Sequence, residues 1–332
     1  MSKNPYTSIV TGAAGFLGSH VVDLLLKNKH HVIAIDNLSN GTWDNLSHWS
    51  DAKLLERHNL DIRSLSQDHP LFRNIDYVFH LAGQECDLTS LHNPEPFFET
   101  NVQGSLKVLQ ASLQSQLKAF VFASSSSIYG NAQTPTLEKD RPNPQSPSAL
   151  SKHMAEQSIF HWGQLYGFKA ISLRIFNAYG PRSVSSNFPG NEFTQLMSHK
   201  FNNSKAIILG SESQERDFIF CTDVANAFLT AAEEGSSQAL YNIGSGKSFS
   251  LYQLCTLLKL KREVLPVKNI WPQKSWADIS KFQFDCNWQP RVPFESGIQF
   301  SLDVLPAWKD SKRWEINDLE KLIHPLRKKC LT

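Results

Sequence analysis

Thr7-Ser8-Ile9-Val10-Thr11-Gly12-Ala13-Ala14-Gly15-Phe16-Leu17-Gly18 is the segment that says most about the architecture of this 332-residue chain. An apolar run leads into glycines spaced Gly-x-x-Gly-x-x-Gly, and an amphipathic stretch follows from Phe16 to Lys27. Glycines permit a tight turn and close backbone approach, and the first turn of a helix offers free N–H groups to a pyrophosphate. The pattern therefore predicts a strand, a phosphate-binding turn and a helix.

The same alternation of short β-branched runs and amphipathic stretches continues along the first half of the chain. The runs predict strands at 8–11, 31–36, 54–57, 76–80, 119–123 and 170–176. The amphipathic stretches predict helices at 16–27, 96–112 and 147–166. Parallel strands joined by helices cross over right-handedly, so we expect an α/β fold with a doubly wound parallel Rossmann sheet.

After Asn177 the alternation fades, and loops rich in Ser, Asn, Pro and Gly follow. A helix is expected again at 223–232 and a strand at 239–243. We therefore expect two domains. The sheet domain, which carries the phosphate-binding turn, would hold residues 1–176 plus about 218–246, and a smaller mixed C-terminal substrate domain would hold about 177–217 plus 247–332.

The second expected strand indicates which dinucleotide is bound, because it ends in an acid, Asp36. A carboxylate at this position hydrogen-bonds the ribose hydroxyls of NAD and repels the 2′-phosphate of NADP. No arginine or lysine occurs between Asp36 and Lys53 to bind that phosphate. The predicted cofactor is NAD.

Composition argues against several other classes of protein. The net charge of +2 is too small for a protein built around nucleic-acid phosphates. The chain has no run of about 18 apolar residues that could span a membrane. Its five cysteines lack metal-ligand spacing, and no apolar signal region opens the sequence. We therefore expect a cytoplasmic protein without a metal site.

Further segments match one family. His80-Leu81-Ala82-Gly83 and Asn101-Val102-Gln103-Gly104, together with the glycine spacing, resemble motifs of the extended short-chain dehydrogenase/reductases. The similarity is to their NAD-dependent epimerases and dehydratases, most of all the UDP-glucose and UDP-N-acetylglucosamine 4-epimerases, and extends from about Thr7 to Gly297. It implies an NAD site made of Gly12, Gly15, Phe16, Leu17, Gly18, Asp36, Asn37, Ser39, Asn40, Gly41, Asp61, Ile62, Leu81, Ala82, Gly83 and Lys152.

The expected helix at 147–166 carries the most informative departure from the family. Ser146 can cap this helix and Pro147 suits its first turn, so Ser148 and Lys152 face the same way one turn apart. This resembles the family's Tyr-x-x-x-Lys helix, in which the tyrosine moves the proton while the lysine lowers its pKa and holds the nicotinamide ribose. Here the lysine is present and Ser148 stands at the tyrosine position. A serine hydroxyl is far less acidic than a phenol with a pKa of about 10.

Serines also follow the fifth expected strand. By resemblance, Ser125 matches the catalytic Ser/Thr that hydrogen-bonds the sugar hydroxyl being oxidised. The next two positions are Asp and Glu in the 4,6-dehydratases and are Ser126 and Ser127 here, which cannot eliminate water near neutral pH. Serine-rich versions are typical of the UDP-hexose 4-epimerases, including those acting on N-acetylated sugars. The candidate catalytic residues are therefore Ser125, Ser126, Ser148 and Lys152.

The resemblance also implies a nucleotide-sugar partner, most like a UDP-linked one. Asn177 lies in a segment that contacts the nucleotide diphosphate in relatives, and Arg216 in one whose arginine pairs with a phosphate. Gln84 and Ser126 complete the expected substrate-binding set. Relatives dimerise through the helices expected at 96–112 and 147–166, so we expect a homodimer.

These observations favour an NAD-dependent 4-epimerase of a UDP-hexose or UDP-N-acetylhexosamine, acting by transient oxidation at C4. Two alternatives stay open: a nucleotide-sugar ketoreductase or dehydrogenase, and a catalytically silent NAD or nucleotide-sugar binding protein. The missing tyrosine itself has three interpretations, in this order. In the first, the tyrosine has been replaced and turnover is lost. In the second, another acid or base serves, either a water beside Ser148 or one of Glu85, Cys86 and Asp87. In the third, the protein binds NAD or a nucleotide sugar without catalysis.

Overall fold

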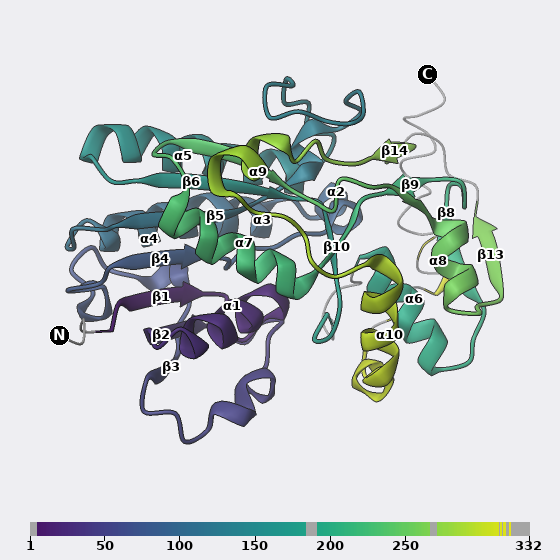
Figure 1. Ribbon diagram of the computed structural model, residues 1–332, viewed down its shortest axis with the longest axis horizontal. Coiled ribbons are helices and arrows are strands. Elements are labelled where there is room, and N and C mark those ends of the chain that lie inside the picture. The colour runs from purple at the N-terminus through teal and green to yellow at the C-terminus, as the bar shows by residue number, and fades with distance from the viewer. Residues whose placement is uncertain are drawn as a thin grey trace.

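A seven-stranded parallel sheet forms the centre of the computed structural model, which describes residues 5–183, 191–265, 271–311, 313, 315, 316 and 319 (Figure 1). The strands have the order β11-β6-β5-β4-β1-β2-β3. Their bounds are β1 Thr7–Thr11, β2 His31–Asp36, β3 Leu55–Asn59, β4 Tyr77–His80, β5 Ala119–Ser125, β6 Ala170–Ile175 and β11 Ala239–Ile243. The expected doubly wound sheet is confirmed, and its order reverses between β1 and β4, where such sheets bind ligands.

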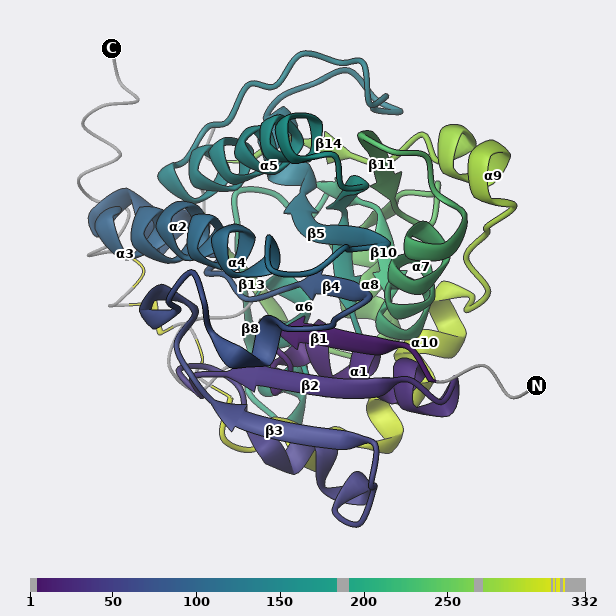
Figure 2. The same ribbon diagram turned by 90° about the vertical axis from the view of Figure 1, so that its left-hand side faces the viewer.

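Helices cover both faces of the sheet (Figure 2). α1 and α7 lie against one face and α4 and α5 against the other, with bounds α1 Phe16–Lys27, α4 Ser105–Ser112, α5 Pro147–Tyr166 and α7 Cys221–Glu234. Successive strand residues point to opposite faces, so Val10 is buried on the α1 side and Ile9 on the α5 side. In the described part of the chain, no helix is long and apolar enough to cross a membrane.

The helix predicted at 96–112 is interrupted, which corrects that prediction. The segment forms α3 (Glu95–Phe98), a π-helical turn over Glu99–Gly104 and then α4. Within the turn, the Asn101 side chain accepts a hydrogen bond from the Gln84 N–H and donates one to the Gln84 carbonyl, both at 2.8 Å. Apolar periodicity does not reveal one extra residue in a turn, and π turns are frequent at functional sites.

A second, mixed region is built around a cluster that includes Tyr179, Phe193 and Trp308. Its strand pairs are β7 Asn177–Tyr179 with β10 Phe218–Phe220, β8 Ala206–Leu209 with β13 Arg262–Leu265, and β9 Glu215–Arg216 between β12 Phe249–Ser250 and β14 Lys274–Ser275. The other α-helices are α2 Asp87–His92, α6 Glu192–Phe201, α8 Leu251–Leu257, α9 Ser280–Cys286 and α10 Phe294–Asp303. The 3₁₀ turns are η1 Trp43–Trp49, η2 Ile62–Ser64, η3 Pro70–Phe72, η5 Ser126–Tyr129 and η6 Leu305–Trp308.

α9 packs on the sheet although it follows most of the second region in sequence. The ring of Phe282 on α9 lies 4.8 Å, centroid to centroid, from that of Tyr241 on β11. Both side chains belong to the core on the α1 side of the sheet. This part of the segment 247–332 therefore contributes to the sheet region, while the two-domain division stays a prediction.

A buried ion pair anchors α5 to the sheet. Glu156 of α5 is 0% exposed and accepts hydrogen bonds from Arg174 of β6 at 2.6 and 3.1 Å. It also accepts hydrogen bonds from Ser124 at 2.7 Å and Ser172 at 2.9 Å. Burial alone would raise the pKa of Glu156, but the hydrogen bonds that its carboxylate accepts lower it to about 2. Because Lys152 lies one turn earlier on α5, the pair also fixes where Lys152 enters the site.

Replacing this carboxylate by an amide, Glu156→Gln, should lower the free energy of unfolding at pH 7 by about 3–5 kcal/mol, because Arg174 would remain buried without a counter-charge. A folded-state pKa of about 2 lies below the unfolded value of about 4.3. The stabilisation is therefore full above about pH 5 and is lost as the pH falls toward 2. Urea unfolding at several pH values measures it.

Glu234→Gln, at an exposed position on α7, is the matched control. If the difference in the free energy of unfolding between Glu156→Gln and wild type stayed constant from pH 7 to pH 3, the assignment of a lowered pKa to Glu156 would be contradicted.

Candidate active site

A cavity of about 520 Å³ opens at the carboxyl ends of β1, β2, β4 and β5 and reaches the second region. Every residue that the sequence predicts to bind NAD lines it, from the glycine turn to Lys152. The predicted reaction and substrate residues that also line it are Gln84, Ser125, Ser126, Asn177 and Arg216. A volume of this order is usual for small-molecule sites in proteins. The structure thus brings both predicted sets of residues to one cavity.

The turn between β1 and α1 is packed too tightly to admit side chains. Gly12 has φ +69°, and a Cβ there would lie 2.7 Å from the Ala82 nitrogen. A Cβ on Gly18 would lie 1.9 Å from the Gly12 carbonyl oxygen. The first N–H groups of a helix have no intrahelical partner, and residues 16–18, which open α1, line the cavity. This cradle fits the pyrophosphate of a dinucleotide.

Asp36 stands at the end of β2, where the adenosine ribose of NAD is expected. Its Oδ2 accepts a hydrogen bond from the Ala14 N–H at 3.0 Å, and its Oδ1 accepts one from the Leu38 N–H at 2.8 Å. Burial raises the pKa of Asp36, and the backbone hydrogen bonds oppose this shift. The carboxylate is therefore held in a fixed orientation at the cavity wall.

Arg63 lines the same end of the cavity, and the sequence analysis did not single it out. Its guanidinium contacts Asp61 at 2.7 Å and Glu99 at 3.1 Å. The hydrogen bond from Arg63 lowers the pKa of Asp61 to about 2. Two carboxylates thus balance the charge of Arg63, which leaves it poorly suited to bind a 2′-phosphate.

Lys152 reaches the cavity from α5 through a buried path. Its side chain is 5% exposed, and its Nζ donates a hydrogen bond to the Ala123 carbonyl at 2.9 Å. The ammonium also lies 5.3 Å from the centroid of the Phe122 ring. Burial lowers the pKa of Lys152, and the nearby charge of Glu85 opposes this shift.

Ser125 and Glu85 form a short polar contact at this end of the cavity. The Ser125 hydroxyl donates a hydrogen bond to Glu85 Oε1 at 2.5 Å and lies 2.9 Å from the Ser127 hydroxyl. Glu85 comes from the segment after β4 and is exposed to the cavity. The sequence analysis named Glu85 only as one of three possible substitutes, because its contact with Ser125 joins segments 40 residues apart.

Ser148 does not line the cavity, although the sequence analysis made it a catalytic candidate. Its side chain is 1% exposed, and its Oγ accepts a hydrogen bond from the Cys86 N–H at 3.4 Å. The backbone of the segment after β4 therefore lies over the position at which the family carries its tyrosine.

The segment 84–87 is held at both ends. Asn101 bonds both backbone groups of Gln84 and donates a further hydrogen bond to the Ser151 hydroxyl at 2.8 Å. At the other end, Asp87 accepts a hydrogen bond from the hydroxyl of Ser146, the N-cap of α5. Burial raises the pKa of Asp87 to about 6, and the charges of Glu85 and Glu192 act in the same direction.

Arg216 marks the opposite end of the cavity and is 4% exposed. Its guanidinium donates hydrogen bonds to the Pro272 carbonyl at 2.9 Å and to Gln214 Oε1 at 2.5 Å. Its Nε lies 3.7 Å from a carboxylate oxygen of Glu192, and burial lowers the pKa of Arg216. Within the described part of the chain, the carboxylate recorded near this buried cation is the loosely placed one of Glu192, an arrangement that an anionic ligand would complement.

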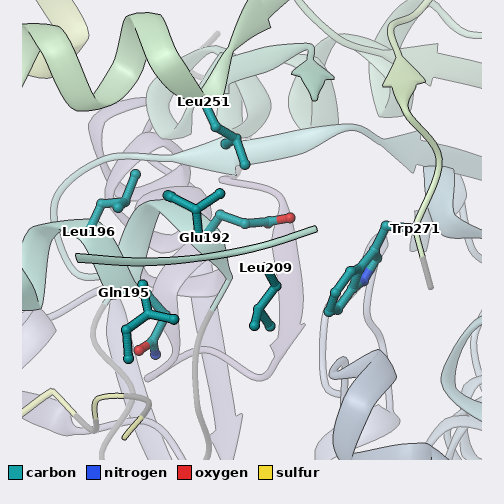
Figure 3. Close-up of a pocket in the computed structure, with 8 residues that line it drawn as sticks. Glu192, Gln195, Leu196, Leu209, Leu251 and Trp271 are labelled. Atoms are coloured by element: carbon teal, nitrogen blue, oxygen red, sulfur yellow. The ribbon is translucent and has the colours of Figure 1, made fainter. Parts of the chain in front are cut away.

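A small apolar pocket adjoins this end and shares two side chains with the main cavity, Glu192 and Trp271. Figure 3 shows Glu192 extending toward the side on which the Trp271 ring stands, with Leu209 below the Glu192 side chain in this view. Neither Glu192 nor Trp271 was predicted from the sequence, because nothing in their local sequence indicates a binding role.

The fold and this cavity define a dinucleotide-binding enzyme of the α/β class. The profile of the NAD dependent epimerase/dehydratase family matches residues 8–244, and the chain belongs to that family. The expected cofactor, NAD, is the cofactor of the family. The chain is 32% identical to a putative UDP-glucose 4-epimerase from Methanocaldococcus jannaschii, over 88% of this chain and 95% of the relative. It is 31% identical to a UDP-glucuronate 4-epimerase from Thermodesulfobacterium geofontis, over 88% and 93%.

Solved structures of related enzymes agree with the fold. A UDP-glucose 4-epimerase from Thermotoga maritima with UDP-glucose superimposes with a TM-score of 0.84 at 31% identity, over 90% of this chain and 98% of that one. A UDP-glucuronic acid 4-epimerase from Bacillus cereus, in complex with UDP-glucuronic acid and NAD, gives 0.84 at 27% identity, over 90% and 99%.

Asp36→Asn should weaken NAD binding by about tenfold or more, because an amide cannot accept both backbone hydrogen bonds that the carboxylate accepts. It should also narrow the preference for NAD over NADP, because the charge that repels a 2′-phosphate is removed. Isothermal titration with each dinucleotide measures both effects. Asp44→Asn, at an exposed position in η1, serves as the control, and an unchanged NAD-to-NADP ratio in Asp36→Asn would speak against the role of Asp36.

Ser148→Tyr should lower the thermal midpoint and should not raise turnover, since the phenol would have to displace the Cys86 backbone. Overpacking of this kind costs about 1–3 kcal/mol. Thermal unfolding and an epimerisation assay measure the two effects, with Ser148→Ala as the small-residue control. A Ser148→Tyr protein that kept its thermal midpoint and gained turnover would show instead that the family's tyrosine has been lost and can be restored.

Proposed function

We propose that the protein is a nucleotide-sugar 4-epimerase that acts on a UDP-hexose or a UDP-N-acetylhexosamine. The observation that carries this proposal is the single cavity that runs from the glycine turn, past Lys152 and Ser125, to Arg216. A dinucleotide and a nucleotide sugar would meet in it near Ser125. NAD, when bound, supplies the acceptor and later the donor of the C4 hydride.

Each end of the cavity has a separate task in this proposal. Lys152 would hold the nicotinamide ribose with its buried ammonium, and Ser125 would orient the C4 hydroxyl. Asn177 and Arg216 would bind the diphosphate, for which a buried guanidinium is well suited. Ser126, with Gln84, would contact the sugar.

The UDP-linked substrate is supported by the relatives rather than by a uracil-specific residue. The solved relatives hold UDP-glucose in one case and UDP-glucuronic acid with NAD in another. A third, a UDP-N-acetylglucosamine 4-epimerase from Methanobrevibacter ruminantium with UDP-N-acetylmuramic acid, has a TM-score of 0.84 at 29% identity, over 91% of this chain and 98% of that one. Elimination of water is disfavoured, because serines stand at the dehydratase acid and base positions.

We also propose that the protein is a cytoplasmic homodimer whose subunits meet through α4 and α5. Leu150 and Met154, one turn apart on α5, are both exposed apolar side chains. Tyr166 at the end of α5 and Leu113 just after α4 are exposed as well. Exposed apolar side chains gathered on neighbouring helices are typical of subunit interfaces.

The test is to incubate the purified protein with NAD and, in turn, UDP-glucose, UDP-N-acetylglucosamine and UDP-glucuronate, and to follow the products by NMR. The expected result is the C4 epimer of at least one sugar without net formation of NADH. Accumulation of NADH with a keto sugar would favour the dehydrogenase alternative. Tight binding of all three sugars without any product would favour the silent binding protein.

A further inference from the structure

We propose that Glu85 is the proton acceptor of the reaction and acts through the hydroxyl of Ser125, in place of the family's tyrosine. This inference rests on the proposed 4-epimerase function. The Ser125 hydroxyl donates a hydrogen bond to Glu85 Oε1 at 2.5 Å, and both residues line the cavity. Ser125 is the residue that would orient the C4 hydroxyl, so two hydrogen bonds, with Ser125 between them, would link the reacting oxygen to Glu85.

The other candidate groups near this point are engaged elsewhere. Ser148 is buried beneath the Cys86 backbone and does not reach the cavity. The Cys86 thiol lies 3.1 Å from the Thr89 hydroxyl, and burial raises its pKa. The carboxylate of Asp87 accepts a hydrogen bond from the hydroxyl of Ser146. Among the acids and thiols of the segment after β4, Glu85 is the one whose contact with Ser125 the structure shows.

Three titratable groups lie close enough to Glu85 to be influenced by its charge. The buried ammonium of Lys152, on α5, interacts with the charge of Glu85, which raises the pKa of Lys152 against the effect of burial. The charge of Glu85 also raises the pKa of Asp87 and of Cys86, at the start of α2. Carboxylates are ionised near neutral pH and can accept a proton there, which a serine hydroxyl cannot do.

The proton transfer balances in both directions. When the C4 hydroxyl is oxidised, its proton moves to Ser125 Oγ while the proton of Ser125 moves to Glu85 Oε1. The hydride from C4 goes to the NAD of the proposed function. When the keto group is reduced on its other face, Glu85 returns the proton to Ser125 and Ser125 returns one to the C4 oxygen. The protein therefore ends each cycle in its starting protonation state.

The place of Glu85 depends on the serine at position 148. The backbone of Cys86, the next residue after Glu85, lies against the Ser148 hydroxyl. A phenol at position 148 would fill the volume that this backbone now occupies. In this arrangement Ser148 positions the segment and Glu85 carries the proton.

Glu85→Gln keeps the size of the side chain and removes its basicity. It should lower kcat for UDP-hexose epimerisation by about 100-fold or more, the usual effect of losing general acid–base catalysis. KM for the sugar, the dissociation constant for UDP and the thermal midpoint should stay close to wild type. In Glu85→Ala, added formate should restore part of kcat, because a small carboxylate can enter the vacated space. Steady-state kinetics, titration calorimetry with UDP and thermal unfolding give the readouts.

Glu95→Gln on α3 makes the same chemical change at an exposed position and should leave kcat at the wild-type level. Glu85 is excluded as the proton acceptor if wild type epimerises a UDP-hexose and Glu85→Gln does so at a similar rate. A loss of kcat in Glu85→Gln that came with weaker UDP binding and no formate rescue would assign Glu85 a structural role instead. If wild type itself forms no epimer from any of the sugars, the proposed function fails first and this mechanism with it.

Discussion

The side-chain amide of Asn101 is the interaction on which the reaction end of the cavity depends. It bonds the N–H and the carbonyl of Gln84 and reaches Ser151 on α5. The segment after β4 is thereby fixed across α5, with Glu85 turned toward the cavity and Ser148 covered. The π-helical turn is what brings Asn101 to this point. One amide thus couples the interrupted helix, α5 and the loop that lines the reaction site.

The serine at position 148, where the family carries a tyrosine, is covered by the loop after β4. In the pattern of the family, one helix carries both the lysine and the proton carrier. Here α5 keeps Lys152 and its anchor to the sheet through Glu156, and the carboxylate of Glu85 contacts Ser125 from the segment after β4. We infer that proton transfer has moved from the helix to the segment after β4, with the cradle for the dinucleotide unchanged.

Local patterns were enough to predict most of the fold and a set of cofactor-binding candidates that the structure gathers in one cavity. α1 and α5 have the bounds expected from the glycine turn and from the Ser146 cap, and Asp36 lies where an NAD-binding acid should lie. The reaction end could not be predicted in the same way. The contact between Ser125 and Glu85 depends on the conformation of the loop after β4, whose sequence has no repeating pattern. The burial of Ser148 depends on the same loop conformation.

Infrared difference spectroscopy would observe the proposed proton acceptor itself. Spectra of protein labelled with ¹³C at its glutamate carboxyl groups would compare the resting state with the state in which bound UDP-hexose has been oxidised, with Glu85→Gln as the reference for assignment. If Glu85 accepts the proton, a band of a protonated carboxylic acid appears on sugar oxidation and is absent from Glu85→Gln. A glutamate spectrum that does not change on sugar oxidation would contradict the mechanism.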